Sequence, residues 1–455
     1  MKSTKAKLVS GAIYMTSPAS DLLDKIRQQF DTSPYPRVPL DKSPKDNPNL
    51  LYIHSLVTPY YLRNQKVIDT KEKVILDAGC GTGYKSLVLA EANPGAKIVG
   101  IDISEESIKL AQQRLEHHGF DNAEFHVLPI QELPKLNYQF DYINCDELLY
   151  LFPDLAAALQ GMISVLKPNG IIRSNLHSSI QRFPYFRAQK VFTMMGLMDE
   201  NPQDLEMEIV VETMKALKDN VELKARTWNP NKYEGENGKE GILMNYLFQG
   251  DKGYTISDMF TALKAADIEF ISMVNWRQWD LINLFKDPDN LPVFLDMSLP
   301  EISIEERLQL FELINPIHRL IDFWCGHSNQ VQAFIPVSQW ADSDWRLAKV
   351  SLHPQLKTRN FQEDLIACIT EFKIFPISDY LSLVEEFVGI DSSLALCLIP
   401  LLEQSQPMKF LVEHWKQFRP LDPITLKPTD EEQAFQMVQQ LLLKLESLGY
   451  IMLEL

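Results

Sequence analysis

The pattern of apolar and polar positions divides this chain into segments with different periods. Between residues 71 and 177, short apolar runs alternate five times with segments of helical periodicity. Strands that alternate with helices are typical of a parallel sheet with helices on both faces. The pattern therefore predicts a doubly wound α/β domain, whose ligand site lies at the carboxyl ends of the strands.

After Ser179 the period changes to a long helical one over residues 181–219, and a polar loop follows over 229–241. We expect the later elements in this order: a helix over 255–266, a strand over 268–274, a helix over 302–325 and a seventh strand over 330–336. The predicted fold is a mostly parallel, Rossmann-like seven-stranded sheet over residues 71–341, with helical insertions near 180–241 and 280–328.

The two flanking regions have weaker patterns. Residues 1–70 are predicted to form an N-terminal helical segment, with one helix over 20–30 and another over 49–65. Residues 342–455 are predicted to form a small α or α+β domain. A helix over 434–448, a glycine and a last strand are how many winged-helix domains finish, so a winged-helix-like domain is one interpretation.

The most specific local signal is the run from Val74 to Gly83, a short apolar strand that leads into a glycine turn. Three glycines allow the backbone to turn tightly and to approach a ligand: Gly79, Gly81 and Gly83. Asp77, at the end of the strand, would repel a pyrophosphate but would pair with a cationic amine. A second apolar strand ends at Asp102, the position from which a carboxylate binds both ribose hydroxyls.

The segment from Lys71 to His177 resembles the class I S-adenosylmethionine (SAM) dependent methyltransferases, in which D-x-G-x-G-x-G follows the first strand and an acid ends the second. Phe125 to Pro134 is similar to the third-strand region that borders adenine. Phe140 to Asp146 is similar to the fourth strand, which opens on the methyl-transfer site, and Leu166 to Ile172 to the turn into the fifth. The resemblance implies an enzyme that uses SAM as its cofactor and transfers a methyl group.

The resemblance also implies a set of cofactor-binding residues. They are Asp77, Gly79, Cys80, Gly81, Gly83, Asp102, Ile103, Ile130, Gln131 and Asn144. Pro129 departs from the pattern, because the family often has an acid there that contacts the adenine amine. Adenine would then rely on the backbone of Ile130 and on Gln131. The string Ile26 to Arg37 resembles an N-terminal signature of a bacterial subgroup, and its Tyr35 either covers the cofactor or joins the first helix to the sheet.

The acceptor-binding candidates lie where the fourth and fifth strands end. Methyl transfer needs an acceptor lone pair in line with the methyl group, and a base only if the acceptor is protonated. Asp146 and Glu147 are candidates to hold an amine or amide proton, and His177 is a candidate general base. The alternatives are that Asp146 caps the following helix, that Glu147 is solvated and that His177 bonds to local backbone. Residues 144–147 lack the N/D-P-P-Y/F quartet of adenine methyltransferases, and Cys145 is interpreted as a buried thiol.

Composition narrows the classes of partner. The 44 basic and 61 acidic side chains give a formal charge of −17, which argues against nucleic-acid binding. The five cysteines are scattered, so neither disulfides nor zinc is expected and a reducing cytoplasm fits best.

His318 and Asp322, four apart in a predicted helix, are interpreted as a local pair, so no metal site is expected. No apolar run approaches the ~20 residues that span a bilayer, and Ser10 and Gly11 interrupt the apolar start, which we interpret as a frayed tail.

The leading hypothesis is a SAM-dependent methyltransferase that modifies an N or O acceptor. The many residues outside the minimal core favour either a protein acceptor or a sizeable metabolite, and the sequence does not choose between them. The competing hypothesis is a regulatory protein that binds SAM without turnover, which Pro129 favours. The sequence carries no signal for the oligomeric state.

Overall fold

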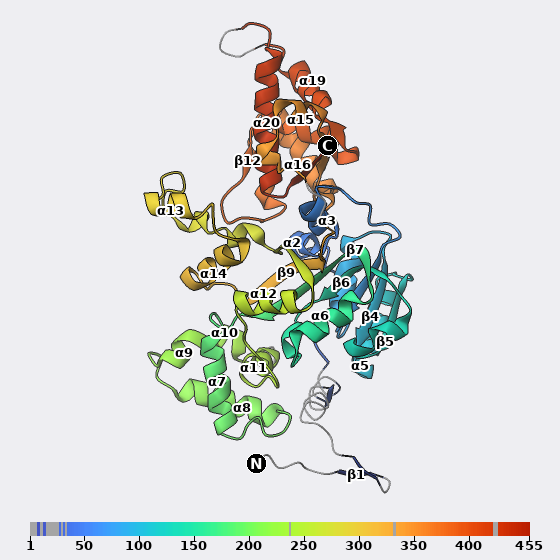
Figure 1. Cartoon of the computed structure of the whole chain (residues 1–455), viewed down its shortest axis with the longest axis vertical. Coiled ribbons are helices and arrows are strands. Elements are labelled where there is room, and N and C mark those ends of the chain that lie inside the picture. Colours follow the sequence, from blue (N-terminus) through green and yellow to red (C-terminus); the bar gives the residue numbers. More distant parts are fainter. Residues whose placement is uncertain are drawn as a thin grey trace.

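A computed structural model describes residues 7–9, 12–14, 27–28, 31, 34–235, 238–330, 334–421 and 426–455. A helical insertion, the central sheet and a C-terminal region follow one another along the long axis of the molecule (Figure 1). The helix expected over 20–30 and the apolar start of the chain fall mostly outside the described residues.

Seven strands form the central sheet, in the order β5-β4-β3-β6-β7-β9-β8. In that order they are Ala123–Val127, Lys97–Asp102, Val74–Ala78, Phe140–Cys145, Leu166–His177, Leu320–His327 and Ile268–Met273. The first five strands in this order, β5, β4, β3, β6 and β7, pair in parallel. Strand β9 runs antiparallel to both of its neighbours, β7 and β8. The arrangement confirms the predicted mostly parallel, Rossmann-like sheet.

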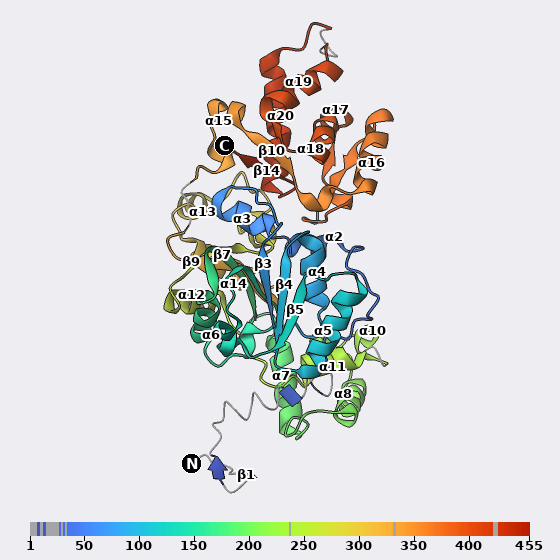
Figure 2. The same ribbon diagram turned by 90° about the vertical axis from the view of Figure 1, so that its right-hand side faces the viewer.

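Helices cover both faces of this sheet because successive strand residues point in opposite directions. Ile75 belongs to an apolar cluster with residues of α4 and α5, whereas Leu76 belongs to one with residues of α6 and α12. Figure 2 shows α4 and α5 beside β4 and β5, with α6 and α12 toward the opposite side. The four helices are Tyr84–Ala92, Glu105–His117, Leu155–Ile163 and Ile256–Ala265.

The chain between β7 and α12 forms the helical insertion. Its helices are α7 (Phe183–Met194), α8 (Asp204–Ala216), α9 (Glu222–Thr227), α10 (Pro230–Tyr233) and α11 (Lys239–Tyr246). They share an apolar cluster of their own, centred on aromatic residues such as Phe192, Tyr233 and Tyr246. The polar loop expected over 229–241 is wrong in part, because α10 and the start of α11 lie in it. Pro230 at the first position of α10 suits a helix start, where its missing N–H is not needed.

The prediction of one helix over 302–325 is wrong in part, and the strand expected over 330–336 falls partly outside the described residues. Helix α14 (Ile304–Ile314) follows the short α13 (Val293–Ser298) and ends before Pro316, and the strand that follows is β9. Residues on both faces of β9 are buried, so its apolar run has no alternation that would distinguish it from a helix. A proline disfavours helical backbone in the preceding residue and was the available signal. Residues 331–333 lie outside the described chain, and their described neighbours 330 and 334–336 are not in a strand.

The helix expected over 49–65 is two helices, α2 (Pro48–Ile53) and α3 (Val57–Asn64). The side chain of Asn93 holds the break between them, since Oδ1 accepts from the Leu56 N–H at 2.8 Å and Nδ2 donates to the His54 carbonyl at 2.9 Å. A distant residue therefore ends α2 and leaves His54 in the gap between the helices.

The C-terminal region has its own apolar cluster, which runs from Val337 to Leu453 and includes Tyr52 of α2. Three antiparallel strands cross it, in the order β13-β10-β14. They are Gln406–Pro407, Lys349–Leu352 and Ile451–Glu454, and the main helices are α15 (Asp342–Leu347), α16 (Arg359–Thr370), α19 (Met408–Phe418) and α20 (Glu431–Ser447). The helix expected over 434–448 and the strand after it are present, and the domain boundaries stay predictions.

Candidate active site

The glycine turn between β3 and α4 has the backbone that the sequence predicted. Gly79, Gly81 and Gly83 have φ values of +75°, +51° and +80°, which residues other than glycine rarely adopt. The Asp102 carboxylate at the end of β4 accepts from the Gly81 N–H at 3.0 Å and from the Ser104 N–H at 2.9 Å. Burial raises the pKa of Asp102, although those two N–H groups lower it. The turn and the acid of the next strand therefore lie together, as ribose recognition requires.

Asp77 lies buried beside this turn and is held from two sides. Its Oδ2 accepts from the Ser86 hydroxyl at 2.6 Å, and its Oδ1 accepts from the Asn144 amide at 2.9 Å. Burial raises the pKa of Asp77 to about 6, against the effect of these two hydrogen bonds. A cationic group from a ligand would stabilise the ionised form, which agrees with the amine predicted to pair with Asp77.

Residues 34–40 cross the glycine turn, and we call this segment the strap. The Thr82 N–H donates to the Tyr35 carbonyl at 3.1 Å, and the Thr82 hydroxyl donates to the Pro36 carbonyl at 2.7 Å. Arg114 of α5 donates to the carbonyls of Val38 and Pro39 at 2.8 and 2.7 Å. The backbone carbonyls of the strap therefore attach it to the glycine turn and to α5. This position is compatible with both proposed roles of Tyr35, which are to cover the cofactor or to join the N-terminal segment to the sheet.

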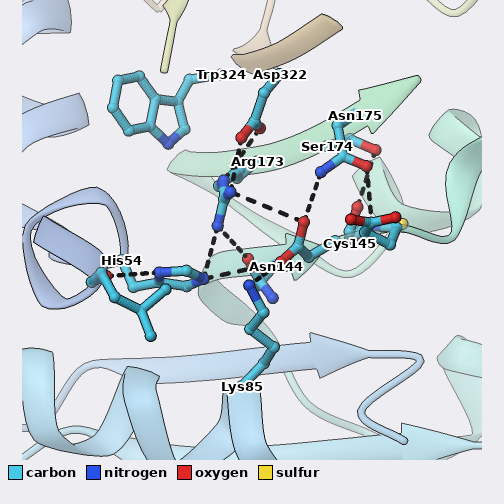
Figure 3. Close-up of polar contacts among 12 residues, drawn as sticks. His54, Lys85, Asn144, Cys145, Arg173, Ser174, Asn175, Asp322 and Trp324 are labelled. Atoms are coloured by element: carbon cyan, nitrogen blue, oxygen red, sulfur yellow. Dashed lines mark hydrogen bonds and ion pairs between the residues drawn. The ribbon is translucent and has the colours of Figure 1, made fainter. Parts of the chain in front are cut away.

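A buried polar cluster links the ends of β6, β7 and β9 (Figure 3). Arg173 forms two hydrogen bonds with Asp322, at 2.7 and 3.1 Å, and its Nη1 lies 2.7 Å from His54 Nε2. Burial, with Arg173 and Lys85 nearby, lowers the pKa of His54 to about 3, so the ring is neutral and accepts from Arg173. Nη1 of Arg173 also donates to the side-chain oxygen of Asn144, Oδ1, at 3.4 Å. This contact orients the Asn144 side-chain amide, whose nitrogen donates to Asp77.

Asp146 faces three cations or amides. Lys85 Nζ lies 2.7 Å from its Oδ2, Arg173 Nη2 lies 3.8 Å from its Oδ1, and the Asn175 amide donates to Oδ1 at 2.5 Å. Burial would raise the pKa of Asp146, but Lys85 and Arg173 hold it well below its usual range. The carboxylate caps no helix, because the next helical turn begins at Leu149 with no side-chain cap. The capping alternative is therefore wrong.

Glu147 forms an ion pair with Arg319, the residue that precedes β9. The Arg319 guanidinium donates to both carboxylate oxygens, one of them at 3.1 Å. Glu147 has a φ of +58°, a left-handed conformation that Asn175 stabilises by accepting the Glu147 N–H at 2.9 Å. Burial would raise the pKa of Glu147, but the nearby His177 and Arg319 side chains lower it to about 2. Glu147 is therefore a paired anion, and the alternative of a solvated side chain is wrong.

His177 is held by side chains from outside its strand. Its Nδ1 lies 2.6 Å from Asp251 Oδ1, and its Nε2 lies 3.1 Å from Arg319. Its ring stacks on Tyr150 with centroids 3.8 Å apart, and Arg182 holds the other Asp251 oxygen at 2.7 Å. The arrangement places a proton on Nδ1 and leaves Nε2 as the acceptor. The expectation of a histidine bonded only to local backbone is wrong.

The remaining predicted residues lie around these groups. Ile103 is half-buried after β4, Ile130 is buried at the start of the 3-10 helix over Ile130–Leu136, and Gln131 is exposed. Cys80 and Cys145 are buried free thiols, and burial raises the pKa of each. The structure thus brings the predicted cofactor and acceptor residues to one edge of the sheet, while their roles stay predictions.

Metal and membrane sites are not found in the described part of the chain. No group of three or more His, Cys, Asp or Glu side chains there is placed to hold a metal ion. His318 precedes β9 and stacks on Trp279, whereas Asp322 lies in β9, so their predicted helical pair is wrong. No described helix combines the length and apolar character needed to cross a membrane.

Five site residues were missed because their neighbours in space are distant in sequence. They are His54, Lys85, Arg173, Asp251 and Arg319. Arg173 offered a signal, since a charged residue inside an apolar strand needs a buried partner. Asp251 and Arg319 lie in connecting segments whose polar character is ordinary, and only the fold brings them to His177.

A family model described as a methyltransferase domain matches residues 69–257. These residues form a methyltransferase domain. The "Uncharacterized protein syc1184_c" of Synechococcus is 25% identical over 69% of this chain and 73% of its own length. A malonyl-[acyl-carrier protein] O-methyltransferase of Acetivibrio thermocellus is 34% identical over 23% of this chain and 36% of that enzyme. A ubiquinone biosynthesis O-methyltransferase of Acinetobacter baylyi is 33% identical over 25% of this chain and 45% of that enzyme, so the match spans less than half of either enzyme.

The solved structure of PKMT2 from Rickettsia typhi has the same fold. It superimposes with a TM-score of 0.57 over 92% of this chain and 76% of its own, at 16% identity. PKMT2 has also been solved in complex with AdoHcy, the product of SAM. The family match and these methyltransferase relatives support a SAM-dependent methyltransferase domain over residues 69–257. The roles of the glycine turn, Asp77 and Asp102 in binding this cofactor stay predictions.

Proposed function

We propose that this protein transfers the methyl group of SAM to a nitrogen or oxygen atom of a side chain on a partner protein. The observation that carries the proposal is the His177–Asp251 pair, which lies beside the Glu147–Arg319 ion pair at the ends of β6 and β7. SAM supplies an activated methyl group when bound. The residues of this chain then have to hold the acceptor and remove its proton.

His177 is the better candidate for the proton acceptor. Glu147, with a pKa of about 2, is a weak base and is better suited to position a cationic or donor group. Asp251 accepts the Nδ1 proton and so directs the Nε2 lone pair of His177 toward Arg319. An acceptor hydroxyl or ammonium that replaces the Arg319 contact would give its proton to Nε2, and Asp251 would stabilise the resulting imidazolium.

Two surfaces near Arg319 and the strap support a protein acceptor. A small, partly open pocket lies between the strap and helices α8 and α11, with Tyr35, Met207 and Met244 in its lining. Its enclosed space does not accommodate a sizeable metabolite. Tyr35 lines this pocket, and burial together with the nearby Glu147 raises the pKa of its hydroxyl.

The second surface is an exposed apolar area on α13, α14 and the turn before Arg319, which project from the same side of the molecule (Figure 1). Its side chains are between 38% and 79% exposed, and they are Val293, Phe294, Met297, Leu310, Leu313, Ile314 and Ile317. Exposed apolar side chains in this number are typical of macromolecular contacts. We infer that it helps to position the acceptor protein.

Two alternatives have support of their own. A metabolite acceptor is favoured by the relative from Acinetobacter baylyi, which is named as a ubiquinone biosynthesis O-methyltransferase. SAM binding without turnover is favoured by Pro129 at the expected adenine contact. We also propose that the protein is cytoplasmic. All five cysteines are free thiols, which suits a reducing compartment.

The deciding experiment incubates the protein with methyl-tritiated SAM and an extract of the source organism that has been separated into macromolecules and metabolites. Label in protein that disappears with His177→Ala supports the proposal, whereas label only in the metabolite fraction supports the first alternative. Retained SAM binding with no transfer to either fraction supports the second. His117→Ala, an exposed histidine on α5, is the matched control and should transfer normally.

A further inference from the structure

Lys85 lies next to two acids beside the glycine turn. It is the second residue of α4, its side chain is 34% exposed, and Figure 3 shows it reaching from the helix toward the end of β6. Its Nζ lies 2.7 Å from Asp146 Oδ2. Both groups also act on Asp77, since Asp146 raises and Lys85 lowers the pKa of that carboxyl. One ammonium and two carboxylates therefore share this part of the site.

Asp146 Oδ2 is a buried oxygen with a cation beside it but no aligned donor. Lys85 is close enough for an ion pair, yet Oδ2 accepts no hydrogen bond from any described residue. The other oxygen accepts from Asn175 at 2.5 Å, so the carboxylate is fixed in place. Lys85 therefore stabilises this oxygen by its charge but with poor hydrogen-bond alignment, so a ligand ammonium that donates to Oδ2 would be a better partner.

We propose that Lys85 binds the carboxylate of the amino-acid end of SAM, while the ammonium of SAM takes the place of Lys85 between Asp77 and Asp146. This proposal rests on the SAM-dependent function stated above. The amino-acid end of SAM is a zwitterion, so its ammonium complements the two acids and its carboxylate complements Lys85. Every charge keeps a partner in the exchange, which avoids the cost of a buried unpaired ion.

The two members of the ion pair differ in freedom to move. Asp146 is 5% exposed and fixed by Asn175, whereas Lys85 is partly exposed and has a long, flexible side chain. Lys85 therefore moves in the exchange and Asp146 stays. The Lys85–Asp146 pair thus occupies the position that the ammonium of SAM takes in the exchange.

The test compares ligands that differ at the amino-acid end. Isothermal titration would measure three dissociation constants: for S-adenosylhomocysteine, for its decarboxylated analogue, which keeps the ammonium, and for 5′-methylthioadenosine, which lacks both groups. The wild-type protein should bind S-adenosylhomocysteine about 10- to 100-fold more tightly than the decarboxylated analogue, the range of a charge-assisted hydrogen bond.

Lys85→Met should remove most of that difference and leave 5′-methylthioadenosine binding unchanged, and Lys85→Gln serves as a second variant if Lys85→Met folds poorly. Lys85→Arg should keep part of the difference. Lys109→Met is the matched control, because Lys109 is an exposed lysine on α5 that pairs only with Glu105 and Glu106 in the described chain.

An unchanged difference in both neutral variants would overturn the assignment of Lys85. An equal loss for all three ligands would also overturn it, because it would indicate a structural role. If the wild-type protein bound none of the ligands, the SAM-dependent function itself would fail, so the two failures are distinguishable.

Discussion

Replacing Arg173 by methionine should destabilise the protein through the carboxylate that it leaves behind. The Arg173 side chain is 3% exposed and that of Asp322 is 16% exposed, so water compensates little when the guanidinium is removed. Removal of one partner from a buried ion pair costs about 3–5 kcal/mol. His54 and Asn144 also lose a donor, but both keep a second contact, at Leu50 and Asp77 respectively. We therefore expect a loss of about 3–5 kcal/mol in the free energy of unfolding.

The loss should depend on pH in a defined direction. Burial raises the pKa of Asp322 in the folded protein, and Arg173 opposes that effect. Without Arg173 the folded pKa rises further above the unfolded value of about 3.9. The folded variant then binds a proton that the unfolded chain has released, so its stability falls as pH rises from about 4 through the folded pKa. The penalty should be larger at pH 7 than at pH 5.

Urea denaturation of Arg173→Met at these two pH values would measure the effect, with fluorescence of the buried Trp324 in the same strand pair among the signals. Arg173→Met combined with Asp322→Leu removes both charges and should recover most of the loss, since an apolar pair can replace a buried ion pair. A loss below about 1 kcal/mol, or the same loss at both pH values, would refute the reasoning from an unpaired carboxylate.

Three further changes test the site. Asp102→Ala should weaken S-adenosylhomocysteine binding, because up to two charge-assisted hydrogen bonds of about 1.5–3 kcal/mol each are lost; unchanged affinity by titration in a folded variant would remove Asp102 from the site. Gly81→Val should displace the strap, since a Cβ there would lie 2.3 Å from the Tyr35 carbonyl oxygen, and limited proteolysis near Tyr35 should increase. Gly119 also has a positive φ, of +81°, but has open space around it, so Gly119→Val should leave the strap intact. His177→Ala should lower single-turnover methyl transfer by ~10²-fold or more with SAM affinity nearly unchanged; full activity would move the proton acceptor elsewhere.

The parts of the fold that could be predicted are those with local causes. The glycine turn requires a positive φ at three positions, and glycine adopts this conformation without the steric strain that a Cβ would cause. The strands that alternate with helices up to His177 were predictable for the same reason, because buried parallel strands are short apolar runs. Asp77 and Asp102 could be assigned because each lies at the end of such a strand.

The missed parts have causes that lie elsewhere in the chain. The end of α2 at Ile53 depends on Asn93, and the orientation of His177 depends on Asp251 and Arg319. Strand β9 could not be distinguished from a helix because both of its faces are covered. In each case the deciding neighbour is brought close by the fold, and no periodicity in the sequence records it.

The packing of α3 against the C-terminal region has a consequence for biosynthesis. The Tyr61 hydroxyl accepts from the Leu453 N–H, and these residues are 392 positions apart. Val57 and Tyr61 also share an apolar cluster with Met452. At ribosomal rates of about 5–20 residues per second, this face of α3 waits roughly 20 to 80 s for its partner. This face of α3 therefore stays without its native partner until the C-terminal strand has been synthesised.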